Sequence, residues 1–113
     1  MDRNETVSKC ILQINSGKFQ EADATLSSIL KQEPSCYQAL VARGTCRALA
    51  GSTSPAELKK ADADFSKALA QMPLLADVWK RRSQARAALG NTDGAAKDLE
   101  ECLSKYVAPS VAP

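Results

Sequence analysis

The feature that most constrains this chain is an internal repeat of a glycine, an alanine and a large apolar residue. Three glycines interrupt helical runs and an alanine follows each of them, as Gly17 and Ala22, Gly51 and Ala61, and Gly90 and Ala95. Further core-type residues stand four and seven positions after each alanine: Leu26 and Ile29, Phe65 and Ala68, and Leu99 and Cys102. The alanines lie 39 and then 34 residues apart. Such a period predicts one helical hairpin built three times.

Each residue of this pattern has a physical reason. The glycine permits a left-handed conformation that ends the first helix of a hairpin. The alanine lets the two helices approach closely, and the large residue one turn later fills the space beside it. Because each hairpin leaves one face uncovered, the next hairpin packs on it. The pattern therefore predicts a short right-handed superhelix in which the first helix of each hairpin lines a concave face.

The helix boundaries follow from periodicity and from the breakers. We expect six helices and no strand, over residues 3–16, 18–32, 35–50, 55–72, 75–89 and 92–105. Gly17, Pro34, Gly51, Pro73 and Gly90 separate them. They form one domain over residues 3–107, with repeats at about 3–36, 37–75 and 76–107, and a flexible tail at 108–113.

Two details of the helices follow from local sequence. The glycine-to-alanine spacing is 5 residues in the outer repeats and 10 in the middle one, so we place an insertion in the loop before Ala61. In that loop Ser54 suits an N-cap, with Pro55 at the first helical position and Glu57 three residues on. In the last repeat the inward-facing groups are expected to be Trp79, Leu89, Ala95 and Leu99.

Composition excludes several classes of function. The net charge of +2 is too small to indicate a nucleic-acid partner. The N-terminus has no apolar signal segment and no stretch reaches the length of a membrane span, so we expect a cytoplasmic protein, with a nuclear location left open. Histidine is absent, which excludes a histidine triad, and there is no phosphate-binding glycine loop. We expect no enzyme activity and no cofactor.

The four cysteines fit the same interpretation. They show no Cys-x-x-Cys spacing and no histidine accompanies them, so a metal site is not favoured. Reduced structural thiols are the main expectation and a redox-responsive thiol is the alternative. Cys36 follows Pro34 and Ser35 in a predicted turn and is expected to be the most exposed of the four.

These motifs resemble those of tetratricopeptide-repeat proteins over residues 3–107. A narrower resemblance is to the plant tetratricopeptide regulator that suppresses effector-triggered immunity, and to its animal relatives. It is carried by Ile14–Phe19 with Ile29–Leu30 and Glu33–Pro34, by Ala39–Thr45, and by Trp79–Gly90 (WKRRSQARAALG). The sequence departs from the family where Cys10 and Ser83 replace a small glycine, and where Gln13, Arg47 and Arg86 replace a tyrosine. The resemblance implies a non-catalytic scaffold for a protein or peptide partner, with a role in immune or other signalling.

The same resemblance implies which residues line the groove. The first helices of the repeats would present a partner-binding set: Val7, Ile11, Ile14, Gln38, Val41, Thr45, Lys80, Arg81 and Gln84. One end of this groove would be apolar and the other basic, which suits a partner segment with hydrophobic anchors followed by acidic residues. The alternative for Val7, Ile11 and Ile14 is plain packing against the neighbouring helix.

The arginines permit two interpretations. Arg82 and Arg86 are expected to pair with acids of the following helix, and Arg43 and Arg47 occupy the matching positions of the second repeat. Lys80 and Arg81 remain candidates for partner binding. RNA binding would require basic residues along the whole groove, which the first two repeats lack.

Two alternatives concern partners. A co-chaperone that grips a terminal carboxylate would have lysine or asparagine at most clamp positions, whereas this chain has Val7, Ile11, Ala42, Asp77 and Arg81 there. Repeat arrays usually finish with a capping helix that has a polar outer face, and no such C-terminal helix is predicted here. The chain is therefore expected either to self-associate through its uncapped ends or to be a fragment of a longer array.

Overall fold

The computed structural model describes residues 2–107, and these residues form six α-helices and no strand. The helices are α1 (Arg3–Asn15), α2 (Phe19–Gln32), α3 (Tyr37–Ala50), α4 (Pro55–Gln71), α5 (Ala76–Ala88) and α6 (Thr92–Val107). The prediction of an all-α chain with six helices is confirmed. The largest differences in boundaries are that α3 begins two residues later than expected and α6 continues to Val107. The predicted flexible tail lies outside the described residues.

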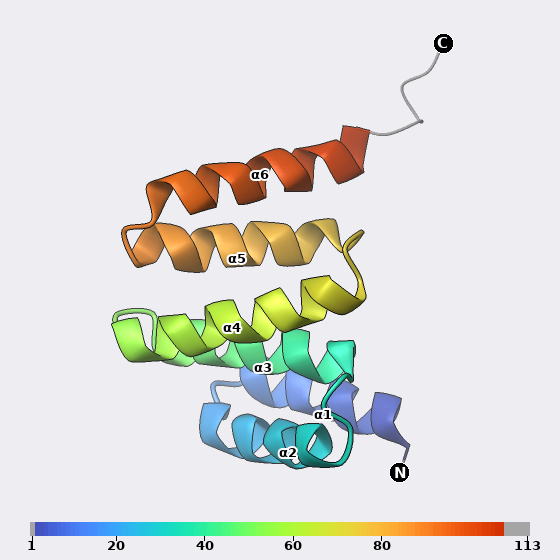
Figure 1. Ribbon diagram of the computed structural model, residues 1–113. Helices are drawn as coiled ribbons and strands as arrows, with labels where there is room; N and C mark the ends of the chain where they lie inside the picture. Colours follow the sequence, from blue (N-terminus) through green and yellow to red (C-terminus); the bar gives the residue numbers. More distant parts are fainter. Residues whose placement is uncertain (1, 108–113) are drawn as a thin grey trace.

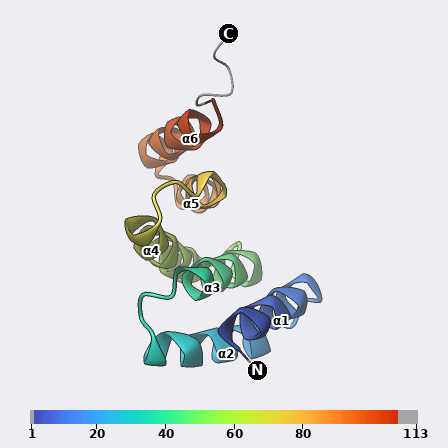
Figure 2. The same cartoon turned by 90° about the vertical axis from the view of Figure 1, so that its right-hand side faces the viewer.

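The helix pairs α1–α2, α3–α4 and α5–α6 stack in chain order along one axis (Figure 1), and the molecule has principal extents of 45, 32 and 24 Å. Each helix packs mainly on its neighbours in the sequence, and the N-terminal and C-terminal helices lie at opposite ends. Viewed along the helices, α1, α3 and α5 lie on one side of the stack, while α4 and α6 lie on the other (Figure 2). This arrangement places the first helix of each hairpin along a common side.

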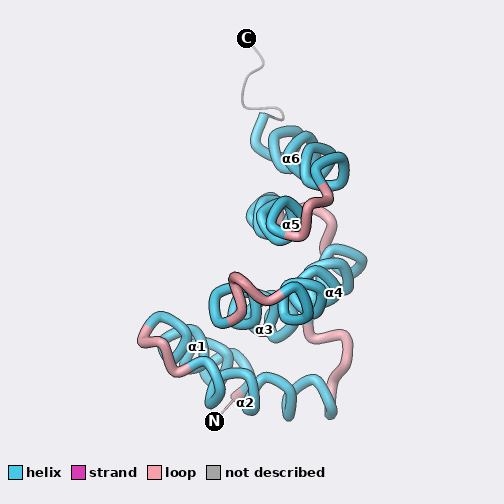
Figure 3. The backbone as a smooth tube through the Cα atoms, turned by 90° about the vertical axis from the view of Figure 1, so that its left-hand side faces the viewer, coloured by secondary structure: helices cyan, strands magenta, loops and turns pink. Residues whose placement is uncertain are grey.

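The core consists of two connected sets of small and apolar side chains. One set joins α1, α2 and α3, and the other joins α4 to α5. Leu26 of α2 and Phe65 of α4 are fully buried. Their counterpart Leu99 is 45% exposed, so the prediction that it faces inward is wrong. The physical reason is that α3 and α5 cover α2 and α4, whereas no described helix covers the outer side of α6 (Figure 3).

The turn glycines behave in two different ways. Gly17 and Gly90 have φ angles of 80° and 85°, so they adopt the predicted left-handed conformation. Gly51 has φ −117°, and the prediction is wrong for it. A Cβ at Gly51 would lie 2.3 Å from Cβ of Glu57. Glycine is needed there because the start of α4 passes close to the turn, and the backbone conformation itself suits any residue.

The extra residues expected before Ala61 are shared between the turn and helix α4. Residues 52–54 extend the turn, and α4 starts six residues before Ala61, whereas α2 starts three residues before Ala22. The added helical turn begins as predicted, because Ser54 is the N-cap, its hydroxyl accepts a hydrogen bond from the amide of Glu57, and Pro55 follows it. The insertion thus lengthens a helix as well as a loop.

Close contacts within hairpins explain why small residues are needed on the first helices. A Cβ at Gly44 would lie 2.7 Å from the ring of Phe65, so only glycine allows this approach. Ser83, at the matching position of α5, is 3% exposed and its hydroxyl donates to the carbonyl of Ala95 at 2.9 Å. Cys10 is the third residue of this kind and is 1% exposed. Ser83 and Cys10, which replace the small glycine, therefore both fit within the packed core.

Two further expectations concern single side chains. Cys36 is the most exposed of the four cysteines, as expected, but at 6% it is still buried, because it precedes α3 at a point where the chain packs into the core formed with α1 and α2. Trp79 is half-buried at the edge of the second core set, and its indole NH donates to the carbonyl of Pro73 at 2.8 Å.

None of the helices over residues 2–107 combines the length and the apolar character that a membrane crossing requires.

Candidate partner-binding groove

A groove of about 770 Å³ is lined by residues of α1, α3, the turn before α5 and the start of α5. Most of the side chains that line it are apolar. It is lined by Asn4, Val7, Ser8, Ile11, Ile14, Asn15, Tyr37, Gln38, Val41, Ala42, Thr45, Leu74, Leu75, Ala76, Asp77, Val78 and Arg81. The helical hairpins bring these residues together because their first helices share one side.

Most of the predicted partner-binding residues meet in this groove. Those that line it are Val7, Ile11, Ile14, Gln38, Val41, Thr45 and Arg81. Gln84 lies in an adjoining hollow of about 190 Å³, which Thr45 and Arg81 also line. Lys80 is exposed and lines neither cavity. Residues 80 and 81, adjacent in sequence, thus project to different surroundings.

The apolar wall contains both core residues and accessible residues. Val7 and Ile14 are 6% and 4% exposed, so their main role is packing, as the alternative interpretation held. Ile11 is 45% exposed and Leu74 is 78% exposed, so both offer apolar surface to a partner. Leu74 escaped the sequence-based prediction because it lies in the turn before α5, where helical periodicity gives no signal.

The charged end of the groove is smaller than its sequence suggested. Arg81 supplies the positive charge among the lining residues, and its Nε lies 3.8 Å from a carboxylate oxygen of Asp77. Both side chains are well exposed, so this pair is weak and Arg81 is free to turn toward another acid. The predicted basic end of the groove is therefore reduced to a single adjustable cation among the lining residues.

Four other arginines, Arg43, Arg47, Arg82 and Arg86, bond to acids inside the stack. On α3, Arg43 donates through Nε and Nη2 to both carboxylate oxygens of Asp64, at 3.0 and 2.9 Å. Arg47 donates to Asp64 at 3.2 Å and to Asp23 of α2 at 3.1 Å. Asp64 is almost fully buried and its hydrogen bond raises the pKa of Arg43 above the usual value. Two helical hairpins are thus joined by a buried ion cluster.

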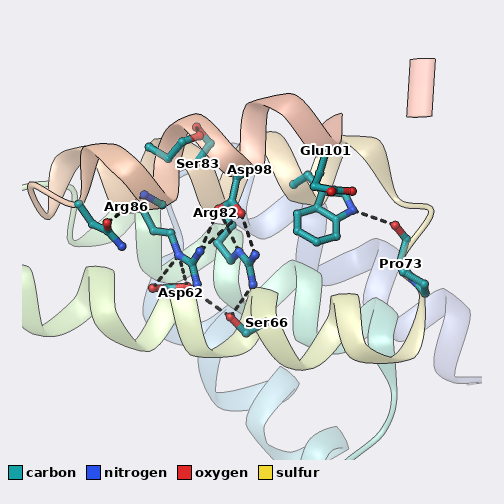
Figure 4. Close-up of polar contacts among 12 residues, drawn as sticks. Asp62, Ser66, Pro73, Arg82, Ser83, Arg86, Asp98 and Glu101 are labelled. Atoms are coloured by element: carbon teal, nitrogen blue, oxygen red, sulfur yellow. Dashed lines mark hydrogen bonds and ion pairs between the residues drawn. The ribbon is translucent and has the colours of Figure 1, made fainter. Parts of the chain in front are cut away.

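The same cluster recurs between α4, α5 and α6 (Figure 4). Arg82 donates to both oxygens of Asp98, at 3.0 and 2.7 Å. Arg86 donates to Asp62 at 3.2 Å and lies 3.5 Å from Asp98. A serine completes each cluster and accepts from the first arginine, Ser66 in this one. The predicted pairing of Arg82 and Arg86 with acids is confirmed, although the bond from Arg86 to the preceding helix was not foreseen.

The thiols offer little reactive chemistry. All four cysteines are unpaired and buried. Burial raises the pKa of both Cys10 and Cys46, and for Cys46 the nearby Asp23 adds to this effect. In the described part of the chain, no three acidic or cysteine side chains gather so that they could hold a metal ion.

No protein-family model matches this chain, and a comparison with curated proteins found no match.

Proposed function

We propose that the chain is a non-catalytic scaffold of three tetratricopeptide-like repeats that binds a segment of a partner protein in its groove. The groove itself is the observation that carries this proposal. It is long and mainly apolar, with accessible Ile11 and Leu74 along its wall and Arg81 at one end. Surfaces of this kind accept an amphipathic segment that places hydrophobic side chains on the wall and a carboxylate beside the cation.

The recurrence of the buried ion cluster supports the repeat interpretation. Asp23, Ser27, Arg43 and Arg47 are followed 39 residues later by Asp62, Ser66, Arg82 and Arg86, and Asp64 is followed 34 residues later by Asp98. The members of each set make matching hydrogen bonds. A duplicated helical hairpin explains the two matching ion clusters better than two independent origins would. We infer that the hairpins form a right-handed superhelix.

The residues that line the groove disfavour a carboxylate clamp, the kind of site that grips the C-terminal carboxylate of a chaperone. Val7 and Ile11 occupy two clamp positions and make the wall apolar, while Asp77 places a negative charge beside Arg81. A terminal carboxylate would therefore meet one cation and a competing acid. An internal segment with at least two apolar residues and one acid fits better.

A peptide selection tests the proposal. Random peptides of about 16 residues are displayed and selected on the full chain, since the groove spans several helical turns. Recovered peptides are expected to pair apolar residues with an acid, and Ile11→Glu and Arg81→Glu are each expected to weaken binding at least tenfold. Lys80→Glu is the matched control, because it makes the same charge change on the neighbouring residue outside the groove. Equal loss in Lys80→Glu and Arg81→Glu, or no loss in Ile11→Glu, would refute the groove assignment.

A further inference from the structure

The outer face of α6 exposes apolar residues whose counterparts are buried at the two earlier junctions. Leu26 and Leu30 of α2 are 0% and 8% exposed, and Phe65 and Leu69 of α4 are 0% and 5% exposed. The residues 34 positions after Phe65 and Leu69 are Leu99 and Leu103, which are 45% and 61% exposed. In the earlier junctions α3 and α5 provide the cover. Leu99 and Leu103, with exposed Ala96 one turn earlier, define what we call the α6 stripe.

The charges beside the α6 stripe differ from those of the earlier junctions in a specific way. At those junctions an arginine of the covering helix donates to a serine, Arg43 to Ser27 at 3.2 Å and Arg82 to Ser66 at 3.0 Å. The residue 34 positions after Ser66 is Glu100, which is exposed. A covering helix with a basic residue at the same place would therefore meet a carboxylate, which binds a guanidinium more strongly than a hydroxyl does.

On α6, no acid stands where it could pair with the second basic residue of a covering helix. Arg86 pairs with Asp62, and the residue 34 positions after Asp62 is Ala96. An occupant with arginines at both positions would leave one charge unpaired against an alanine, at a desolvation cost. The α6 stripe thus favours a helix with a basic residue at the first position and a neutral residue at the second.

The chain's own α1 fits this description at its charged and neutral positions, where Lys9 and Gln13 match Arg82 and Arg86, but it lacks the apolar residues that precede them. On α5 the residues that lead up to Arg82 are Leu75 and Val78, both in the second core set. The matching residues are Asp2, the N-cap of α1, and Glu5 in its first turn, and both side chains are exposed. Stacking α1 of a second copy on α6 would press these two carboxylates against Leu99 and Leu103. The occupant is therefore not a second copy stacked head to tail.

We propose that the α6 stripe is a second docking surface, separate from the groove, for an amphipathic helix of another protein. This helix carries two apolar residues three apart and a lysine or arginine four residues after the second. A small residue follows three positions after the basic one, and a neutral residue follows four positions after it. The first four of these residues stand in the order of Leu75, Val78, Arg82 and Ala85 in α5. It packs on Leu99 and Leu103 and pairs its basic residue with Glu100.

Fluorescence anisotropy with a labelled peptide of this pattern tests the proposal. The probe has the sequence of residues 74–91 with Arg86 replaced by Gln, and it is titrated with the full chain. Saturable binding is expected, weakened at least tenfold by Leu103→Glu and by Glu100→Arg. A probe in which Arg82 is also replaced by Glu should bind Glu100→Arg better than wild type. Circular dichroism verifies that each variant keeps its helicity, which the exposure of these residues allows.

Two matched controls separate the α6 stripe from other surfaces. Leu12 is exposed to 65% at the opposite end of the stack, so Leu12→Glu should bind the probe like wild type. Ile11→Glu places a charge in the groove and should also leave binding of the probe unchanged. Binding of the probe to the α6 stripe can therefore be measured whether or not the groove binds a partner. Absence of saturable binding, or equal binding by Leu103→Glu and wild type, would overturn the proposal. Light scattering of the full chain gives a further test. A dimer that Leu103→Glu dissociates would also overturn the proposal, because a second copy would then occupy the α6 stripe.

Discussion

Replacing Asp64 by alanine tests the energetic role of the buried ion clusters most directly. The side chain of Asp64 is 3% exposed, and its arginine partners Arg43 and Arg47 are 16% and 18% exposed. Asp64→Ala removes the acceptor of two of the three hydrogen bonds of Arg43 and of one from Arg47. The variant therefore leaves one guanidinium without a carboxylate in a mostly dry site.

The expected loss follows from the cost of an unpaired buried charge. Removing one partner of a buried pair costs about 3–5 kcal/mol. We expect about 3 kcal/mol here, toward the lower end of that range, because Arg47 keeps Asp23 and Arg43 keeps Ser27. With an unfolding entropy typical for this length, about 4 °C of melting temperature is lost per kcal/mol, so the midpoint falls by about 12 °C.

Urea unfolding followed by circular dichroism measures this loss, with two comparison variants. Lys60→Ala removes an exposed pair with Glu57 and should cost less than about 1 kcal/mol. A triple variant with Arg43→Met, Arg47→Leu and Asp64→Leu should be more stable than Asp64→Ala, because it leaves no unpaired cation in the cluster. A loss in Asp64→Ala as small as that in Lys60→Ala would refute the reasoning, and so would a triple variant less stable than the single one.

Two further predictions concern the core. Phe65→Ala should lower the free energy of unfolding by about 3–5 kcal/mol, because Phe65 is fully buried. Leu99→Ala, at the matching position of α6, should lower it by less than about 1 kcal/mol. Equal losses of the two variants in urea unfolding would contradict the conclusion that only Phe65 is covered by a neighbouring helix. The raised pKa of Cys46 means that the folded chain keeps the thiol proton to higher pH than the unfolded chain. This contribution to stability is complete below the unfolded pKa and is lost as the pH rises through the folded pKa. Between pH 8 and 10 the wild type should lose more stability than Cys46→Ala, and parallel losses would count against burial as the cause.

The candidate groove could be predicted in part, because three first helices with known phase must share one side. Ile11, Gln38 and Arg81 were assigned to it from the resemblance to tetratricopeptide repeats, and all three line the groove of the structure. Exposure could not be assigned in the same way. Ile11 and Ile14 have similar side chains one turn apart, yet they are 45% and 4% exposed, because only Ile14 points between the helices.

The sequence by itself determined the elements of this fold. Periodicity and breakers specified six helices, since helix formation and termination depend mainly on local residues such as Gly17, Ser54 and Pro55. The pairing of arginines with acids was also readable, because the charges recur at the repeat period.

Only the tertiary structure decided which surfaces are covered. Phe65 and Leu99 are equivalent in sequence, and they differ in exposure because α5 covers one and no described helix covers the other. Lys80 and Arg81 are neighbours in sequence, and the rotation between successive residues of a helix directs just one of them into the groove. Such outcomes depend on contacts between distant segments, which no local pattern contains.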